Sequence, residues 1–114
     1  MKIENTKAQM RKGVLEYCIL AILNNGAQYA SGIIDSLKSA RMIVVEGTLY
    51  PLLTRLKNAE LLSYRWEEST SGPPRKYYAL TEKGEAFLKE LDMTWSDLVK
   101  AVELTTQSKP TNDE

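Results

Sequence analysis

The sequence predicts a mainly α-helical fold with one β-hairpin, built from a chain of 114 residues that suits a single domain. Three observations lead to this fold class. Apolar residues recur at helical spacing in four segments, and they alternate with polar residues in two short runs between positions 62 and 80. A cluster of turn-forming residues separates those two runs.

The first helix is expected over residues 8–24, where apolar side chains follow helical spacing and fill most of the circumference. A helix that is apolar nearly all round is buried on several sides, which suggests a partner chain in so small a protein. Cys18 lies in this stretch and is interpreted as a small buried hydrophobe rather than a redox sensor. Asn24-Asn25-Gly26 ends the helix, with Gly26 suited to a left-handed cap.

Two shorter helices are expected next, over residues 31–40 and 46–59. Ser31 is the expected N-cap of the first, and residues 42–45 fit a connector or a brief strand. Pro51 is expected in the first turn of the second helix, which therefore begins between Glu46 and Thr48, with one of these two residues as its cap. The outward face of this helix is expected to carry Thr48, Tyr50, Pro51, Thr54, Arg55 and Asn58.

The hairpin is expected from the alternating runs 62–67 and 75–80, joined by a turn over residues 69–74 that two prolines stiffen. Two basic residues, Arg75 and Lys76, follow the prolines. Thr81 is the expected cap of a final helix of about 24 residues, a rod of roughly 36 Å. Its apolar residues are spaced by three and four, as in a coiled-coil seam, at Leu88, Leu91, Trp95, Leu98 and Val102.

Composition excludes most enzyme chemistry. The chain has no histidine and one cysteine, which rules out Ser-His-Asp triads, Cys-His pairs and the usual zinc sites, so no enzyme, metal or cofactor is expected. Its longest apolar run, residues 17–23, is far shorter than the roughly 20 residues of a membrane-spanning helix. Residues 1–5 lack the apolar stretch of a signal peptide, so a cytoplasmic protein without membrane contact is expected.

The net charge of zero conceals an uneven distribution. Residues 1–80 carry 11 Lys or Arg against 7 Asp or Glu, whereas residues 81–114 carry 4 against 8. A basic front half could serve a polyanion such as DNA, although two ordinary solvated surfaces explain the same counts.

The order of the elements is that of a winged helix-turn-helix followed by a long dimerisation helix. In that arrangement the third helix enters the major groove of DNA and the hairpin is the wing, so Thr48, Tyr50 and Arg55 become candidate contacts. The alternative is a protein-interaction module that uses the same fold without binding DNA or a ligand.

Three strings resemble the PadR family of bacterial transcriptional regulators: residues 13–20, residues 46–56 (EGTLYPLLTRL) and residues 72–84 (GPPRKYYALTEKG). They match the first helix, the recognition helix, and the wing with the start of the final helix, and the resemblance covers about residues 8–105. One departure lies at Ala59-Glu60-Leu61, where the family often has glycine.

The resemblance implies a homodimeric repressor that binds an inverted repeat in double-stranded DNA, in the small branch of the family with one C-terminal helix. Some members of that branch bind planar, cationic or hydrophobic compounds at the dimer interface, which makes Trp95 and Asp92 possible ligand contacts. Trp95 could equally seal the dimer without any ligand. The domains expected are a winged helix-turn-helix at 1–80, a dimerisation helix at 81–106 and a disordered tail at 107–114.

The expected DNA contacts combine the outward face of the third helix with the wing: Glu46, Gly47, Thr48, Tyr50, Pro51, Thr54, Arg55, Pro73, Arg75 and Lys76. The expected dimer contacts combine the first helix with the seam of the last: Val14, Cys18, Leu88, Leu91, Trp95, Leu98 and Val102.

Overall fold

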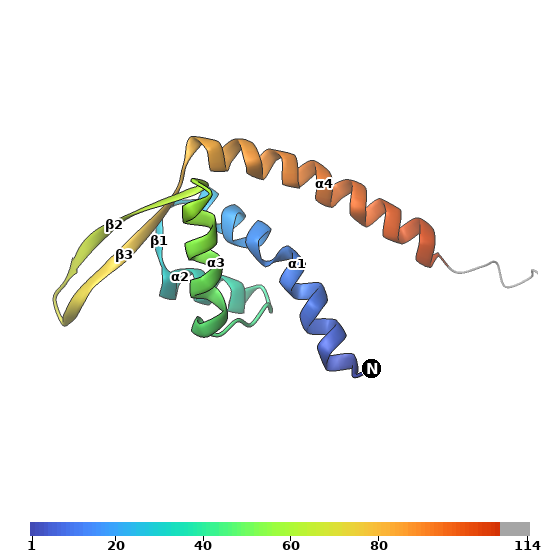
Figure 1. Cartoon of the computed structure of the whole chain (residues 1–114), viewed down its shortest axis with the longest axis horizontal. Coiled ribbons are helices and arrows are strands. Elements are labelled where there is room, and N and C mark those ends of the chain that lie inside the picture. Colours follow the sequence, from blue (N-terminus) through green and yellow to red (C-terminus); the bar gives the residue numbers. More distant parts are fainter. Residues whose placement is uncertain (108–114) are drawn as a thin grey trace, which may run out of the picture.

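The computed structural model describes residues 1–107; the tail expected over 107–114 lies outside the described residues from position 108 onward. The chain is mainly helical, with a three-stranded antiparallel sheet in the order β1-β3-β2, as the sequence predicted in its helical part and its hairpin (Figure 1). The elements are α1 (Ile3–Asn24), β1 (Gln28–Tyr29), α2 (Ala30–Ser39), α3 (Glu46–Asn58), β2 (Leu62–Ser69), β3 (Gly72–Leu80) and α4 (Glu82–Thr106).

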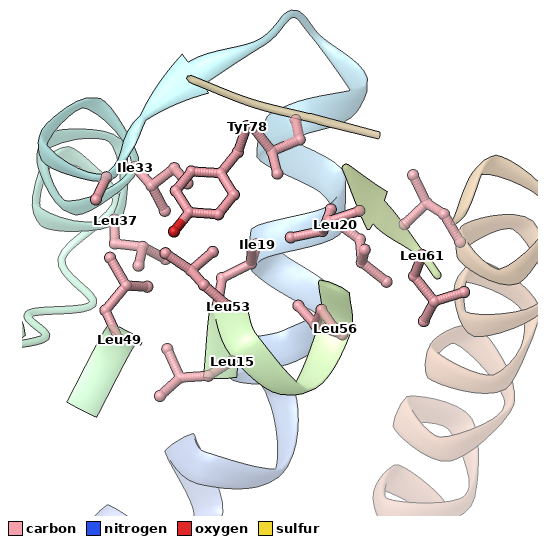
Figure 2. Close-up of a cluster of buried hydrophobic side chains, with 14 residues drawn as sticks. Leu15, Ile19, Leu20, Ile33, Leu37, Leu49, Leu53, Leu56, Leu61 and Tyr78 are labelled. Carbon is pink, nitrogen blue, oxygen red and sulfur yellow. The ribbon is translucent and has the colours of Figure 1, made fainter. Parts of the chain in front are cut away.

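One hydrophobic core lies where α1, α2, α3 and the base of the sheet meet (Figure 2). Ile19 of α1, Ile33 of α2 and Leu53 of α3 are fully buried there, and Tyr78 of β3 covers them from the sheet side. Every buried apolar residue falls between Leu15 and Leu88. The core is therefore formed by the body of the fold, residues 15–88, and by neither end of the described chain.

The first helix is longer at its N-terminus than the sequence predicted, because α1 begins at Ile3 rather than at residue 8. Residues 3–7 hold a single apolar side chain, so no periodicity marks them as helical. Gly26 has a positive φ of 144°, as suits the glycine after a helix end, although this is not the left-handed helical conformation. The expected N-cap at Ser31 is wrong: α2 begins at Ala30, and Tyr29 occupies the cap position without a side-chain bond.

The start of α3 also differs from the prediction. The helix begins at Glu46, within the expected range, but Val45 occupies the cap position and neither Glu46 nor Thr48 caps it. Pro51 is then the sixth helical residue and lies in the second turn. It leaves the carbonyl of Gly47 without its helical partner, a loss that water can compensate because both residues are exposed.

Two helices end in left-handed residues that are not glycine. Glu60 after α3 has a φ of 66°, and the amide of Leu61 donates to the carbonyl of Leu56 at 3.0 Å, which is the Schellman motif. Arg41 after α2 has a φ of 65° in the same motif. The turn at Glu60 therefore has the left-handed geometry that favours glycine.

The hairpin forms as predicted, but its prolines do not lie in the turn. Thr70 and Ser71 make the turn, whereas Pro73 and Pro74 belong to β3. They lie opposite a register irregularity between Glu67 and Ser69, where a missing amide donor costs no regular ladder bond. The pairing of β1 with β3, Gln28 to Tyr78 and Tyr29 to Tyr77, was not predicted, and residues 42–45 form a connector rather than a strand.

The final helix begins as predicted. The hydroxyl of Thr81 accepts a hydrogen bond from the amide of Gly84 at 2.9 Å and donates one to the carbonyl of Glu60 at 2.7 Å. Gly84 is buried, and a Cβ there would overlap the carbonyl oxygen of Leu61. The missing side chain therefore lets α4 start directly against the body of the fold.

Candidate nucleic-acid interface

The outward face of α3 follows from where its core residues lie. Leu49, Leu53 and Leu56 are buried, and each residue advances about 100° around a helix, so the opposite face is centred on Gly47, Pro51, Thr54 and Asn58. All four of these residues are exposed. The centre of this face therefore carries short side chains, which leave room for a partner surface to approach the helix backbone.

The predicted contacts flank this centre on two sides. Glu46 and Tyr50 lie on the side of the wing, where they share a hollow of about 390 Å³ with Trp66, Arg75 and Lys76. Thr48 and Arg55 are exposed on the opposite side, toward α1. The structure thus brings Glu46, Tyr50, Arg75 and Lys76 together, and it places Thr48 and Arg55 apart from them.

The cations of the wing are held over aromatic rings. The amine of Lys76 lies 4.6 Å from the ring centroid of Tyr64 and 5.5 Å from that of Trp66. The guanidinium of Arg75 lies 3.9 Å from the ring centroid of Tyr29, on the neighbouring strand β1. Such contacts favour one position of a cation while leaving its hydrogen-bond donors available to a further partner.

Trp66 and Tyr29 were not among the predicted site residues. Alternation did place Trp66 on the same side of the hairpin as Lys76, its partner in the ladder. Tyr29 reaches the site only through the pairing of β1 with β3, which no local pattern reveals. Trp66 is 62% exposed and could contact a ligand of the wing directly.

Arg55 is already paired within the chain. Its Nε lies 3.2 Å from Oε2 of Glu16 on α1, an oxygen that is buried and has no other partner in the described chain. The side chain of Arg55 remains 75% exposed. A role for Arg55 at a phosphate would therefore require the guanidinium to be shared with, or withdrawn from, Glu16.

The predicted dimer residues divide between the body of the fold and an exposed groove. Leu88 is buried, Leu91 and Cys18 are half-buried against the core, and Val14 is half-buried outside it. Trp95, Leu98 and Val102 are 42–50% exposed. They line a groove of about 490 Å³ between α1 and α4, whose walls consist of Met10, Arg11, Val14, Trp95, Leu98, Val99, Val102 and Glu103.

Asp92, the other possible ligand contact, is not in this groove. It accepts a hydrogen bond of 2.5 Å from the hydroxyl of Tyr17, and this bond, with burial, raises the pKa of Tyr17 to about 12. The Tyr17 ring also lies 6.3 Å from that of Trp95. Glu103 is the carboxylate that lines the groove; sequence reasoning missed it because it lies outside the seam.

Burial raises the pKa of the Cys18 thiol, which disfavours the thiolate that redox sensing needs. Within residues 1–107, no three His, Cys, Asp or Glu side chains are grouped so that they could hold a metal ion. Over the same residues no helix combines the length and the apolarity needed to cross a membrane.

The fold and sequence match known proteins over most of the chain. The model of the PadR-like family of transcriptional regulators matches residues 19–90. A PadR-like transcription factor from Bacteroides fragilis is 64% identical, with 90% of this chain and 99% of that one covered and a TM-score of 0.76. A PadR family transcriptional regulator from Eggerthella lenta is 29% identical, with 94% of both chains covered and a TM-score of 0.85.

A third solved structure, a PadR-like transcriptional regulator from Bacillus cereus, is 36% identical, with 89% of this chain and 99% of that one covered and a TM-score of 0.76. The coverage of almost the whole length of these proteins means that the likeness includes the long α4 as well as the winged helix.

Proposed function

Because this chain belongs to the PadR-like family of transcriptional regulators, which are non-enzymatic DNA-binding proteins, we propose that it is a repressor that binds an inverted-repeat operator as a homodimer. The observation that carries the proposal is the shared hollow in which Tyr50 of α3 meets Arg75 and Lys76 of the wing. This hollow places a helix that could enter the major groove beside cations that could neutralise phosphates. Because an operator lies on the chromosome, the cytoplasm is the proposed place of action.

The contacts divide by chemistry. Arg75 and Lys76 serve phosphates, because their donors remain available beyond the aromatic rings that hold them. Tyr50 contacts a base edge or a phosphate from the second turn of α3. Gly47, Pro51 and Thr54 form the surface that faces the groove floor, where their small size allows close approach of the helix. Glu46 and Thr48 flank that surface, and Pro73 is exposed near the tip of the wing.

The proposed dimer would cover the groove between α1 and α4 with α4 of a second copy. Trp95, Leu98 and Val102 lie exposed along α4, and Met10 and Val14 face them across the groove. A large, stable dimer interface of this kind buries above about 2,000 Å² in total. It would set the two recognition helices roughly 34–36 Å apart, one turn of DNA.

We also propose that a small hydrophobic or cationic ligand releases the DNA by binding beside Trp95 in the dimer. The groove offers a large exposed ring and mostly apolar walls, which suit a planar hydrophobic compound, and the carboxylate of Glu103, which with Arg11 is one of its two charged groups and could pair with a cationic one. Asp92 could take part only by exchanging its hydrogen bond from Tyr17. Quenching of Trp95 fluorescence by a planar cationic dye, measured in a Trp66→Phe protein, tests this; unchanged fluorescence would contradict it.

Binding to DNA is tested by a fluorescence titration of the protein against duplexes from the region upstream of its own gene, at several salt concentrations. We expect tight binding to one duplex and an affinity that falls steeply with salt. The Arg75→Ala/Lys76→Ala protein should bind every duplex more weakly and with a flatter salt dependence. Equal, salt-insensitive binding to all duplexes would contradict the proposal.

A further inference from the structure

The face of α1 that supplies the core changes character after Leu15. Toward the C-terminus this face carries Ile19 and Leu23, both buried, and toward the N-terminus the same face continues with Lys12 and Ala8. No residue of α1 before Leu15 is buried. Figure 1 shows this half of the helix continuing past the body of the fold, at the end of the molecule where α3 begins.

This segment is basic. Residues 2–12 hold four Lys or Arg and one acidic residue, Glu4. None of the salt bridges of residues 1–107 involves Arg11 or Lys12, and both side chains are exposed. Neither side chain is therefore held in an ion pair within the described chain.

Arg11 and Lys12 stand next to the recognition helix. Together with Thr48 and the connector 42–45 they line a groove of about 400 Å³. Thr48 marks the edge of α3 that faces α1, whereas Tyr50 marks the edge that faces the wing. The outward face of α3 thus has basic residues on both flanks: Arg75 and Lys76 on one side, Arg11 and Lys12 on the other.

We propose that Arg11 and Lys12 form a second phosphate-binding edge of the DNA site, opposite the wing. The major groove is about 12 Å wide and is bounded by a phosphate strand on each side, so a helix inserted in it has one strand on each flank. The wing serves one strand and the N-terminal half of α1 serves the other. This inference rests on the proposed function and adds to it a pair of contacts outside the winged helix itself.

A second copy of the chain is the competing partner, because α4 is acidic and Arg11 also lines the groove between α1 and α4. The position of Lys12 favours DNA as the partner, because Lys12 lines the groove beside Thr48 and not the one beside Trp95. The continuity of the Lys12 groove with the outward face of α3 points to the same partner.

The test measures binding to a mixed-sequence DNA duplex as a function of salt for three proteins: wild type, Arg11→Ala/Lys12→Ala, and a control, Lys89→Ala/Lys100→Ala. The control removes the same charge from exposed positions of α4. We expect the slope of log K against log salt to flatten by about 2 per bound protomer in the first variant and to stay unchanged in the control. Lys12→Ala alone should give about half of this change.

Three other results of this titration would each contradict a different part of the account. If wild type binds with a steep slope and Arg11→Ala/Lys12→Ala keeps that slope, the second edge does not exist although the proposed function stands. If the variant instead loses self-association while its slope is retained at saturating protein, the pair serves a second copy, and the inference is overturned. If wild type does not bind duplex DNA at all, the proposed function itself fails.

Discussion

From Leu15 to Leu88 most apolar side chains are buried or half-buried within the chain, with Ile43, Val45 and Trp66 among the exceptions. The N-terminal half of α1 and the C-terminal half of α4 leave most of theirs exposed. Leu53 in the body of the fold has no accessible surface, but Leu98 on α4 is 50% exposed. Both are leucines on one face of an amphipathic helix. The body of the fold therefore closes its core within one chain, while the two arms, residues 3–14 and 92–106, expose apolar side chains that suit contact with another chain.

The largest effect is expected from a charge in the arm. Leu98→Glu should abolish the dimer and with it tight operator binding, because it places a carboxylate in the proposed seam. The fold of each chain should survive, because Leu98 contributes nothing to the core. Sedimentation, circular dichroism and DNA titration check this. Intact DNA binding by a dimeric Leu98→Glu protein would remove α4 from the interface.

Shortening one leucine in each region should have effects that differ in their dependence on protein concentration. Leu53→Ala should lower the free energy of unfolding by about 2–5 kcal/mol at any protein concentration, because it leaves a cavity in a closed core. Leu98→Ala should act through association, so its effect on the denaturation midpoint should shrink as the protein is diluted. A Leu98→Ala effect that does not depend on concentration would mean that α4 packs within its own chain.

The hydrogen bond from Tyr17 to Asp92 joins the body of the fold to the arm of α4. Asp92→Asn should lower the pKa of Tyr17 from about 12 toward its ordinary value of 10, because it removes the negative acceptor. The raised pKa in the folded state stabilises it below pH 10, and this contribution is lost as the pH rises toward 12. Tyrosinate absorbance, compared with a Tyr17→Phe protein, measures the shift; an unchanged pKa would show that the bond does not form in solution.

The smallest effect should be a gain within the body of the fold. Glu60→Gly relieves a left-handed residue at the end of α3 and should raise the free energy of unfolding by about 0.5–1 kcal/mol. Arg41→Gly, after α2, is the matched second site. Chemical denaturation measures both; a loss of stability in both proteins would show that these turns are not strained.

The sequence was sufficient for features that depend on local chemistry. The leucine stripe of α3 predicted its outward face, and Thr81 predicted the start of α4, because a hydroxyl cap and helical spacing act over a few residues. The sequence was insufficient where residues distant in the chain determine the local structure or complete the site. Gln28 and Tyr29 form a strand only because β3 is beside them, and Lys12 joins the site only because α1 passes the start of α3.

Two further features have local causes but were not predicted, because the residue types do not indicate them. Glu60 and Arg41 adopt a conformation that favours glycine, since apolar pairs packed in or against the core hold each turn: Leu56 with Leu61, and Leu37 with Met42. Pro51 lies one turn later in α3 than its usual place, because an exposed carbonyl at Gly47 can bond to water. Packing outweighs the preference for glycine at the two turns, and solvation outweighs the preference for proline in the first turn of a helix.

In the proposed dimer, a second copy of this chain covers the two arms. Sedimentation of the wild-type protein at micromolar concentration tests it most directly. We expect a single species of twice the chain mass of 12.9 kDa. A stable species of 12.9 kDa at that concentration would contradict the dimer, and with it the palindromic operator and the ligand site beside Trp95.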